Sequence, residues 1–463
     1  MLFSSLVFIS VFLPLVLFIC FCAPRSWRNN ILLAASLIFY AWGEMVLVWV
    51  MILSIIWNHL LALMISRNEG SARKIWLFTG VAADLLLLGY YKYMDFFLAN
   101  CNVLFHTSFA LHKIILPIGI SFYTFQAISY LVDVYRNDTP VEKNILNTGL
   151  YITFFPQLIA GPIVKFHEIS AQIRHRQESM SEFACGMQRF IEGLAKKVLI
   201  ANVMAETADT IFACDPGVLT IQDAWLGALA YTMQIFFDFS GYSDMAIGLG
   251  HLFGFTIPEN FNYPYTAVTI TGFWRKWHIS LSSWFREYLY IPLGGSRSGK
   301  WATLRNLLIV FLVTGFWHGA GWTFILWGLW HGIFIIIERI FALDKKVFPR
   351  YIRIFQHAVL LLIVIAGWVL FRAETVSGAW GIVKKMFSFS PNSGESFPVS
   401  PLFIVTFIFA VFFSTDLPRR IYNSFKDNTF ALLVWRAICC GLLFLVLLRL
   451  AGAAYNPFIY FRF

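Results

Sequence analysis

The stretch LFSSLVFISVFLPLVLFICFC, from Leu2 to Cys22, contains no charged side chain. A helix that crosses a lipid bilayer needs about 20 mostly apolar residues, and this stretch has that length. It lacks the basic residues that begin a secretory signal peptide, and it is longer than the roughly 7–15 apolar residues at the centre of one. We therefore expect a membrane-spanning helix that stays in the mature protein.

The rest of the chain shares this apolar character. Hydrophobic residues make up 59 % and charged residues only 13 % of the 463 residues, whereas a soluble chain carries about 25 % charged residues. The apolar runs are too long for the alternating strands of a membrane barrel, so they predict an all-α polytopic membrane protein with about eleven transmembrane or re-entrant helices. We expect one membrane domain over 1–463 with a motif core at 148–340. The further apolar stretches are 31–42, 46–65, 75–91, 114–134, 148–164, 190–203, 224–237, 307–316, 322–337, 358–371, 402–414 and 430–450.

Basic residues gather beside these stretches and give the chain a net charge of +10. Lys and Arg collect in cytoplasmic loops and face anionic membrane lipid, so this excess indicates a lipid surface and not nucleic acid. The same rule predicts that both termini and the 392–400 loop lie outside the cytoplasm. The residues predicted on the cytoplasmic side are Arg25, Arg28, Arg67, Arg73, Lys74, Arg174, Arg176, Arg275, Lys276, Arg286, Lys345, Lys346, Arg350, Arg419 and Arg420.

Two acidic residues interrupt one of the apolar stretches. The run DFSGYSD carries Asp238 and Asp244 directly after the 224–237 stretch. Polar groups at membrane depth occur where they are buried in protein or line a cavity. We expect one of these environments for both carboxylates.

The segment 271–290, TGFWRKWHISLSSWFREYLY, has a helical period. At about 100° per residue, Arg275, His278 and Arg286 share a polar stripe, and tryptophans share another stripe. The pattern predicts one amphipathic helix. An interfacial helix that is anchored by Trp and Arg would have the same pattern.

A second candidate segment, 314–332, carries His318 between Gly315 and Gly319, and His331 further on. Ionisable residues in a spanning region are costly and are functional candidates, although a buried neutral His bonded to a backbone carbonyl is the alternative. We interpret the glycines as allowing a kink or the approach of a ligand, and His331 as a packing residue. A histidine with a pKa near 6.5 is the usual general base, and it could deprotonate a hydroxyl for attack on a thioester.

Other familiar catalytic patterns are missing from the sequence. It contains no Gly-x-Ser-x-Gly elbow, no His-Glu-x-x-His and no phosphate-binding Walker pattern. The seven cysteines have no zinc-ligand spacing, so we expect no metal site. Three possible functions remain, namely an enzyme that uses histidine acid–base chemistry, a channel and a transporter. A transporter would more often show two repeated halves.

Several motifs, in this order, resemble the membrane-bound O-acyltransferases, in particular the bacterial branch that acetylates alginate and peptidoglycan. The resemblance implies a many-helix membrane bundle with a central tunnel and an essential histidine, which matches His318, preceded by a second polar residue, which matches His278. Lys276 stands where the branch often has a second Arg. The motifs are FFPQLIAGP (154–162), DFSGYSDMAIG (238–248), NFNYPY (260–265), FWRKWHISLS (273–282), YLYIPLGG (288–295) and GFWHG (315–319).

The resemblance also implies substrates and partners. The donor would be cytoplasmic acetyl-CoA, and the acetyl group would move across the bacterial inner membrane to an extracytoplasmic polysaccharide, with a periplasmic esterase-like partner finishing the transfer. Arg275, Lys276 and Arg286 would bind the phosphates of the donor, since Arg forms bidentate charge-assisted bonds to phosphate. Two alternatives stay open, namely D-alanyl transfer of the teichoic-acid type and a non-enzymatic transporter or scaffold.

Overall fold

The computed structural model describes all residues except 345, 347, 389–395, 426, 453–454 and 460–463. The described residues form helices and connecting segments without a strand, which confirms the predicted all-α class. By internal contacts, the chain divides into two compact units, Met1–Phe190 with Met245–Pro258, and Ile191–Asp244 with Glu259–Phe463. The single domain stays a prediction, and each unit is described by itself.

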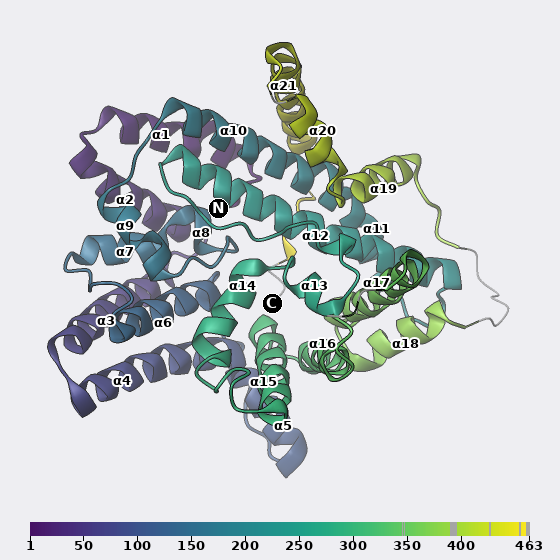
Figure 1. The fold of residues 1–463 in the computed structure, drawn as a ribbon, viewed down its shortest axis with the longest axis horizontal. Coiled ribbons are helices and arrows are strands. Elements are labelled where there is room, and N and C mark those ends of the chain that lie inside the picture. Colours follow the sequence, from purple (N-terminus) through teal and green to yellow (C-terminus); the bar gives the residue numbers. More distant parts are fainter. Residues whose placement is uncertain (345, 347, 389–395, 426, 453–454, 460–463) are drawn as a thin grey trace. The chain divides into compact units, whose positions relative to one another are not determined.

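In the first unit, α3, α4 and α6 pack against one another, as Figure 1 shows, and α2 packs against α7. Nearly every side chain of α6 is buried, so this helix forms the centre of the unit. A phenylalanine cluster that includes Phe8, Phe39 and Phe155 joins the start of the chain to α2 and α8. The helices are α1 (Leu13–Cys22), α2 (Arg28–Ala41), α3 (Val48–Arg67), α4 (Gly70–Leu88), α5 (Met94–Phe105), α6 (Ile120–Arg136), α7 (Ile145–Thr153), α8 (Phe155–Leu158) and α9 (Phe166–Arg174).

In the second unit, α15 packs along α16, which in turn contacts α13 and α17. Two long helices, α10 (Met180–Ala195) and α12 (Ile221–Leu252), belong partly to each unit. The remaining helices are α11 (Asn202–Phe212), α13 (Ile270–Trp274), α14 (Ile279–Phe285), α15 (Lys300–His318), α16 (Trp322–Ile340), α17 (Arg350–Arg372), α18 (Val376–Met386), α19 (Pro401–Phe413), α20 (Leu417–Phe425) and α21 (Thr429–Gly452).

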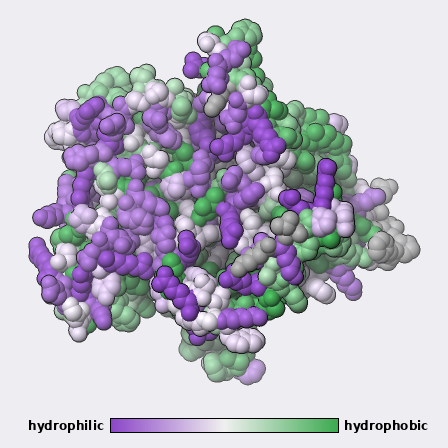
Figure 2. All heavy atoms as spheres, in the orientation of Figure 1, coloured by the Kyte–Doolittle hydropathy of each residue, from purple (hydrophilic) through white to green (hydrophobic). Residues whose placement is uncertain are grey.

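Among the described residues, five helical segments are long and apolar enough to cross a membrane. The α19–α20 pair, bent by 68°, would be a sixth if it forms one broken span. Figure 2 shows hydrophobic side chains, in green, on the surface of the protein, as a lipid environment requires. The five segments are Val48–Arg67, Gly70–Phe105, Trp322–Ile340, Arg350–Arg372 and Thr429–Gly452.

Several expected helices differ from the structure in their bounds. The first apolar helix extends only over Phe8–Cys22, which is short for a span. The 148–164 stretch is divided between α7 and α8, because Phe154 leaves the helical conformation and Pro156 stands in the first turn of a new helix. The 224–237 stretch continues without a break to Leu252.

The predicted sidedness of the loops stays a prediction. It includes Lys345 and positions 392–395 of the 392–400 loop, which lie outside the described residues.

Candidate active site

The segment predicted as one helix, 271–290, is broken in the middle. Helix α13 ends at Trp274, α14 begins at Ile279, and His278 between them has a left-handed backbone with φ of 44°. The physical reason is a competing set of backbone hydrogen bonds to an earlier segment. The N–H of Ile279 donates to the carbonyl of Asn260 at 3.0 Å, and the N–H of Asn262 donates to the carbonyl of Lys276 at 3.0 Å. The prediction of one continuous helix with a polar stripe is therefore wrong.

Asn260 determines the tautomer of His278. The side-chain oxygen of this fully buried residue accepts hydrogen bonds from the backbone N–H of Ser280 at 3.2 Å and from its hydroxyl at 2.9 Å. Because a backbone N–H can only donate, the atom that faces it must be the amide oxygen. The same oxygen lies 3.1 Å from Nδ1 of His278. Nδ1 must therefore carry the proton, which leaves the lone pair on Nε2.

His278 is buried and neutral. Its side chain contacts the ring of Phe239 edge-on at 4.5 Å, and burial lowers the pKa of the imidazole to about 3. Among the described residues, Nε2 has no hydrogen-bond partner. The ring can therefore accept a proton or a hydrogen bond at Nε2, and it has no proton to donate there. This differs from the expected place of His278 on a polar stripe with Arg275 and Arg286.

His318 is the last residue of α15 and lies in an aromatic environment. Its ring is 5.2 Å from Trp327 and 5.1 Å from Phe371, and it lies 6.5 Å from the ring of His278. The two histidines that the sequence singled out are thus neighbours, although they come from different elements.

The glycines beside His318 serve helix packing. A Cβ at Gly315 would lie 2.3 Å from the carbonyl oxygen of Phe324, and a Cβ at Gly319 would lie 2.2 Å from the ring of Phe324. Gly328 of α16 faces Gly315 in the same contact. These glycines let α15 and α16 approach closely and so fix the end of α15, which is a different role from the expected kink or ligand approach.

A small cavity of about 10 Å³ lies against His318. Such a volume has room for about one water molecule. Its wall is otherwise apolar or aromatic, and it does not include His331, which is buried against Trp274 and Trp327. The lining residues are Ile235, Phe239, Trp277, His318, Trp327, Trp368, Phe371 and Ile459.

A buried ion pair holds one wall of this cavity. Lys197 and Asp238 lie 2.7 Å apart, with side chains only 3 % and 2 % exposed. Asp238 also accepts the backbone N–H of Ile459 at 2.8 Å, and Lys197 donates to the carbonyl of Pro457. The expectation that the Asp238 carboxylate is buried in protein is confirmed. Asp244 is likewise buried and forms an ion pair with Lys196 at 2.5 Å.

The three predicted phosphate-binding residues do not share one site. Arg275 and Arg286 are exposed and line neither this cavity nor the second one described here. Lys276 lines the second cavity, of about 300 Å³. The residues around that cavity are Asn262, Tyr263, Thr266, Lys276, Asp416, Arg419, Arg420 and Asn423.

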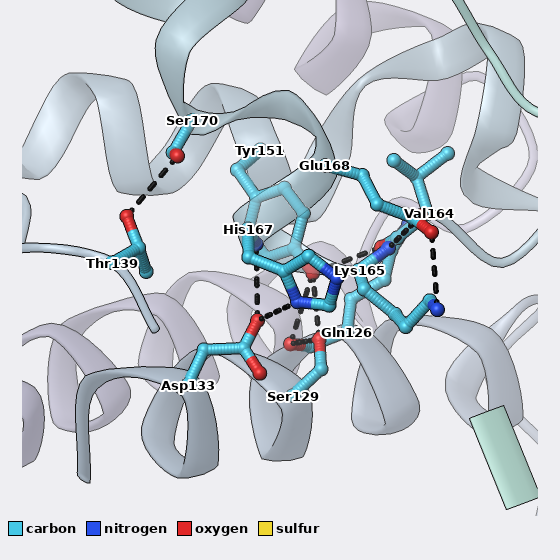
Figure 3. Close-up of polar contacts among 10 residues, drawn as sticks. All are labelled: Gln126, Ser129, Asp133, Thr139, Tyr151, Val164, Lys165, His167, Glu168 and Ser170. Carbon is cyan, nitrogen blue, oxygen red and sulfur yellow. Dashed lines mark hydrogen bonds and ion pairs between the residues drawn. The ribbon is translucent and has the colours of Figure 1, made fainter. Parts of the chain in front are cut away.

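The first unit contains a separate polar cluster, drawn in Figure 3. The Asp133 carboxylate on α6 accepts the backbone N–H of His167 and lies 3.0 Å from its Nδ1. This hydrogen bond raises the pKa of His167. The hydroxyl of Tyr151 lies 2.8 Å from that of Ser129 and donates to the carbonyl of Val164 at 3.0 Å. These bonds attach the segment after the FFPQLIAGP motif to α6 and α7, so we assign the cluster a structural role.

The chain is similar to known proteins over most of its length. A family model described as the membrane-bound O-acyltransferase family matches residues 34–344. The probable alginate O-acetylase AlgI of Azotobacter vinelandii is 41 % identical over 100 % of both chains. The peptidoglycan O-acetyltransferase of Helicobacter pylori is 39 % identical over 83 % of this chain and 80 % of its own. The teichoic acid D-alanyltransferase of Bacillus subtilis is 30 % identical, over 51 % of this chain and 62 % of its own.

Proposed function

The chain belongs to the membrane-bound O-acyltransferase family and is an acyltransferase of the O-acetylating kind, and from this premise we propose its substrates and its chemistry. The acyl donor is cytoplasmic acetyl-CoA, and the acetyl group is passed across the inner membrane to an extracytoplasmic polysaccharide. A periplasmic esterase-like protein completes the transfer. The polysaccharide acceptor is supported by the names of the relatives from A. vinelandii and H. pylori.

The observation that carries the proposal is the pair of buried imidazoles, His278 and His318, with rings 6.5 Å apart. His318 lines an apolar cavity. His318 acts as the general base, because it lines the cavity directly. It takes the proton of the acceptor hydroxyl while the oxygen attacks the thioester carbonyl. When the carbon–sulfur bond breaks, His318 returns the proton to the CoA thiolate, so the base is regenerated.

His278 supports this step as a fixed hydrogen-bond acceptor. Asn260 holds its proton on Nδ1, so the lone pair at Nε2 is available to orient a hydroxyl. The aromatic walls of the cavity keep bulk water away, which protects the thioester from hydrolysis. Both effects favour transfer of the acetyl group to the acceptor over its loss to water.

D-alanyl transfer is the second candidate, and the B. subtilis relative supports it. That similarity covers about half of this chain, whereas the A. vinelandii relative matches all of it. We therefore favour the acetyl group. A transporter or scaffold would need neither a buried His278 nor a His318 that lines an apolar cavity.

The test uses protein purified in detergent, with acetyl-CoA labelled in the acetyl group. The wild-type protein should release or transfer the label, and His318→Ala should lower the rate by about 10²–10⁴-fold, the usual contribution of a general base. Chromatographic retention and thermal stability should match the wild type. Near-normal turnover by this variant would remove His318 from the mechanism. Use of a D-alanyl carrier-protein thioester in place of acetyl-CoA would favour the second candidate.

A further inference from the structure

We propose that the cavity of about 300 Å³ beside Lys276 binds the phosphate groups of the acyl donor. We call it the cationic cavity, and its cations are Lys276, Arg419 and Arg420. The inference rests on the proposed function, because it takes a coenzyme A thioester as the donor. It changes the predicted phosphate-binding set, because Arg275 and Arg286 do not line this cavity, whereas Arg419 and Arg420 of α20 do. All four arginines are exposed.

The charges around the cationic cavity suit a diphosphate. Three cations and one carboxylate, Asp416, line it. Asp416 is occupied by Arg420, whose Nε and Nη2 atoms lie 2.9 Å and 2.7 Å from its Oδ2. Lys276 donates to the hydroxyl of Thr266 at 2.9 Å, and both residues line the cavity. An excess of positive charge therefore remains for an anionic ligand.

Neutral hydrogen-bond donors complete the lining. Asn262 and Asn423 also line the cavity. Phosphate oxygens accept bonds from amides as well as from Lys and Arg, so a phosphate group would find both kinds of partner here. A volume of about 300 Å³ accommodates the diphosphate portion of a donor and not the whole of it.

The same two chain segments connect the cationic cavity to the histidines. The backbone bonds between Asn262 and Lys276, and between Asn260 and Ile279, pair the two segments. Along the second segment, Lys276 lines the cationic cavity, Trp277 lines the cavity at His318, and His278 contacts Asn260. Phosphates at Lys276 would thus be held a short way from the histidines. A coenzyme A thioester has this layout, with its phosphates and its reacting carbonyl at opposite ends of a flexible arm.

The bend between α19 and α20 supplies the two arginines. Helix α20 turns by 68° from the apolar α19, which brings polar residues of α20 to the same cavity as Lys276. An anionic lipid headgroup offers the same phosphate chemistry at such a position. The experiment must therefore distinguish a phosphate of the donor from a phosphate of the bilayer.

The experiment compares two donors on one double variant, Lys276→Gln with Arg419→Gln, in nanodiscs of phosphatidylcholine alone. Acetyl-CoA carries phosphates, and S-acetylpantetheine is the same thioester without them. Loss of two charge-assisted bonds should lower kcat/KM for acetyl-CoA by at least about tenfold, mainly through KM. The kcat/KM for S-acetylpantetheine should be the same in the double variant and the wild type. Arg353→Gln, an exposed cation on α17 outside both cavities, is the matched control.

The other outcomes are equally decisive. Equal losses with both donors would mean that the cations only maintain structure, and the proposal would be wrong. A loss that appears only when phosphatidylglycerol is added, with CoA binding unchanged, would assign the cavity to lipid and overturn the proposal. If the wild type uses neither donor, the proposed function fails separately, and titration with CoA decides the site. If the wild type binds CoA and the double variant does not, the result supports the phosphate site in the cationic cavity. If the wild type does not bind CoA, the proposal is wrong.

Discussion

At the scale of single residues, Asn260 determines which ring nitrogen of His278 carries the proton. The Asn260 oxygen bonds Ser280 and so requires a proton on Nδ1 of His278. Without this oxygen, either tautomer could form, and Nε2 would be protonated for part of the time. A positioning residue of this kind affects the rate of the chemical step more than donor binding.

We therefore expect Asn260→Asp to keep the acceptor and to change the titration of His278. A carboxylate beside an imidazole favours its charged form, so the pKa of His278 should rise from about 3. The acidic limb of the kcat–pH profile should then move to higher pH, because protonated His278 has no lone pair at Nε2. Ser243→Ala, which removes only the 3.1 Å bond to the amide nitrogen of Asn260, is the control. An unshifted profile in the aspartate variant would contradict this role.

His331 should behave differently from His278. It is fully buried against Trp274 and Trp327 and lines no cavity described here. We expect His331→Ala to lower the thermal unfolding temperature, since it leaves a void in a packed aromatic core, while kcat of the folded protein stays within a few-fold. His278→Ala should lower kcat strongly. Parallel thermal melts and turnover assays check both, and the reverse order would mean that the wrong histidine is paired with His318.

At the scale of elements, the contact between α15 and α16 holds His318 in place. Gly315 and Gly328 meet at this contact, where any Cβ would collide with a backbone oxygen at 2.3 Å. Backbone oxygens cannot rotate away as side chains do, so the helices would have to separate.

Gly315→Ala should therefore cost about 1–3 kcal/mol of folding free energy, as overpacking does, and it should also lower kcat because the end of α15 moves. Gly441 in α21 has nothing within 4 Å of a Cβ, so Gly441→Ala is the matched control. That change should leave activity unaltered and gain up to about 1 kcal/mol from helix propensity. Unfolding in denaturant compares the two variants, and equal stabilities would refute the packing role.

The elements also show which features could be predicted from the sequence. Long apolar runs predicted most helices, because bilayer thickness sets their length. The break before His278 could not be predicted, since residues on both sides keep a helical period and the competing bonds come from Asn260 and Asn262. The sequence singled out His318 and His278 in separate segments, and their roles in the site stay a prediction. The grouping of Lys276 with Arg419 depends on a bend between distant helices, and Lys197 carries no local signal of its ion pair with Asp238.

At the scale of the whole molecule, the Lys197–Asp238 pair joins distant parts of the second unit. The pair binds the backbone at Pro457 and Ile459, and Ile459 lines the cavity at His318. Removing one partner of a buried pair leaves an uncompensated charge, which costs about 3–5 kcal/mol. Replacing both partners with apolar residues of similar size is often neutral for stability.

We expect Asp238→Asn to lower stability strongly, and the double change Lys197→Met with Asp238→Leu to recover most of it. Activity should stay low in the double variant, because Ile459 loses the acceptor at its N–H. Thermal melts and acetyl-CoA turnover on the same preparations separate the two effects. Full activity in the stable double variant would show that the position of Ile459 does not matter for catalysis.

The hydrogen bond between Ile459 and Asp238 also affects when the cavity at His318 can form during translation. Its two partners are 221 positions apart, so α12 leaves the ribosome long before Ile459 is synthesised. Until then, the carboxylate of Asp238 lacks one of its partners and the cavity at His318 lacks a wall. A nascent chain can thus contain both histidines and α15 while the cavity at His318 is still incomplete. The cavity at His318 is therefore completed only after Ile459 has been translated, long after both histidines.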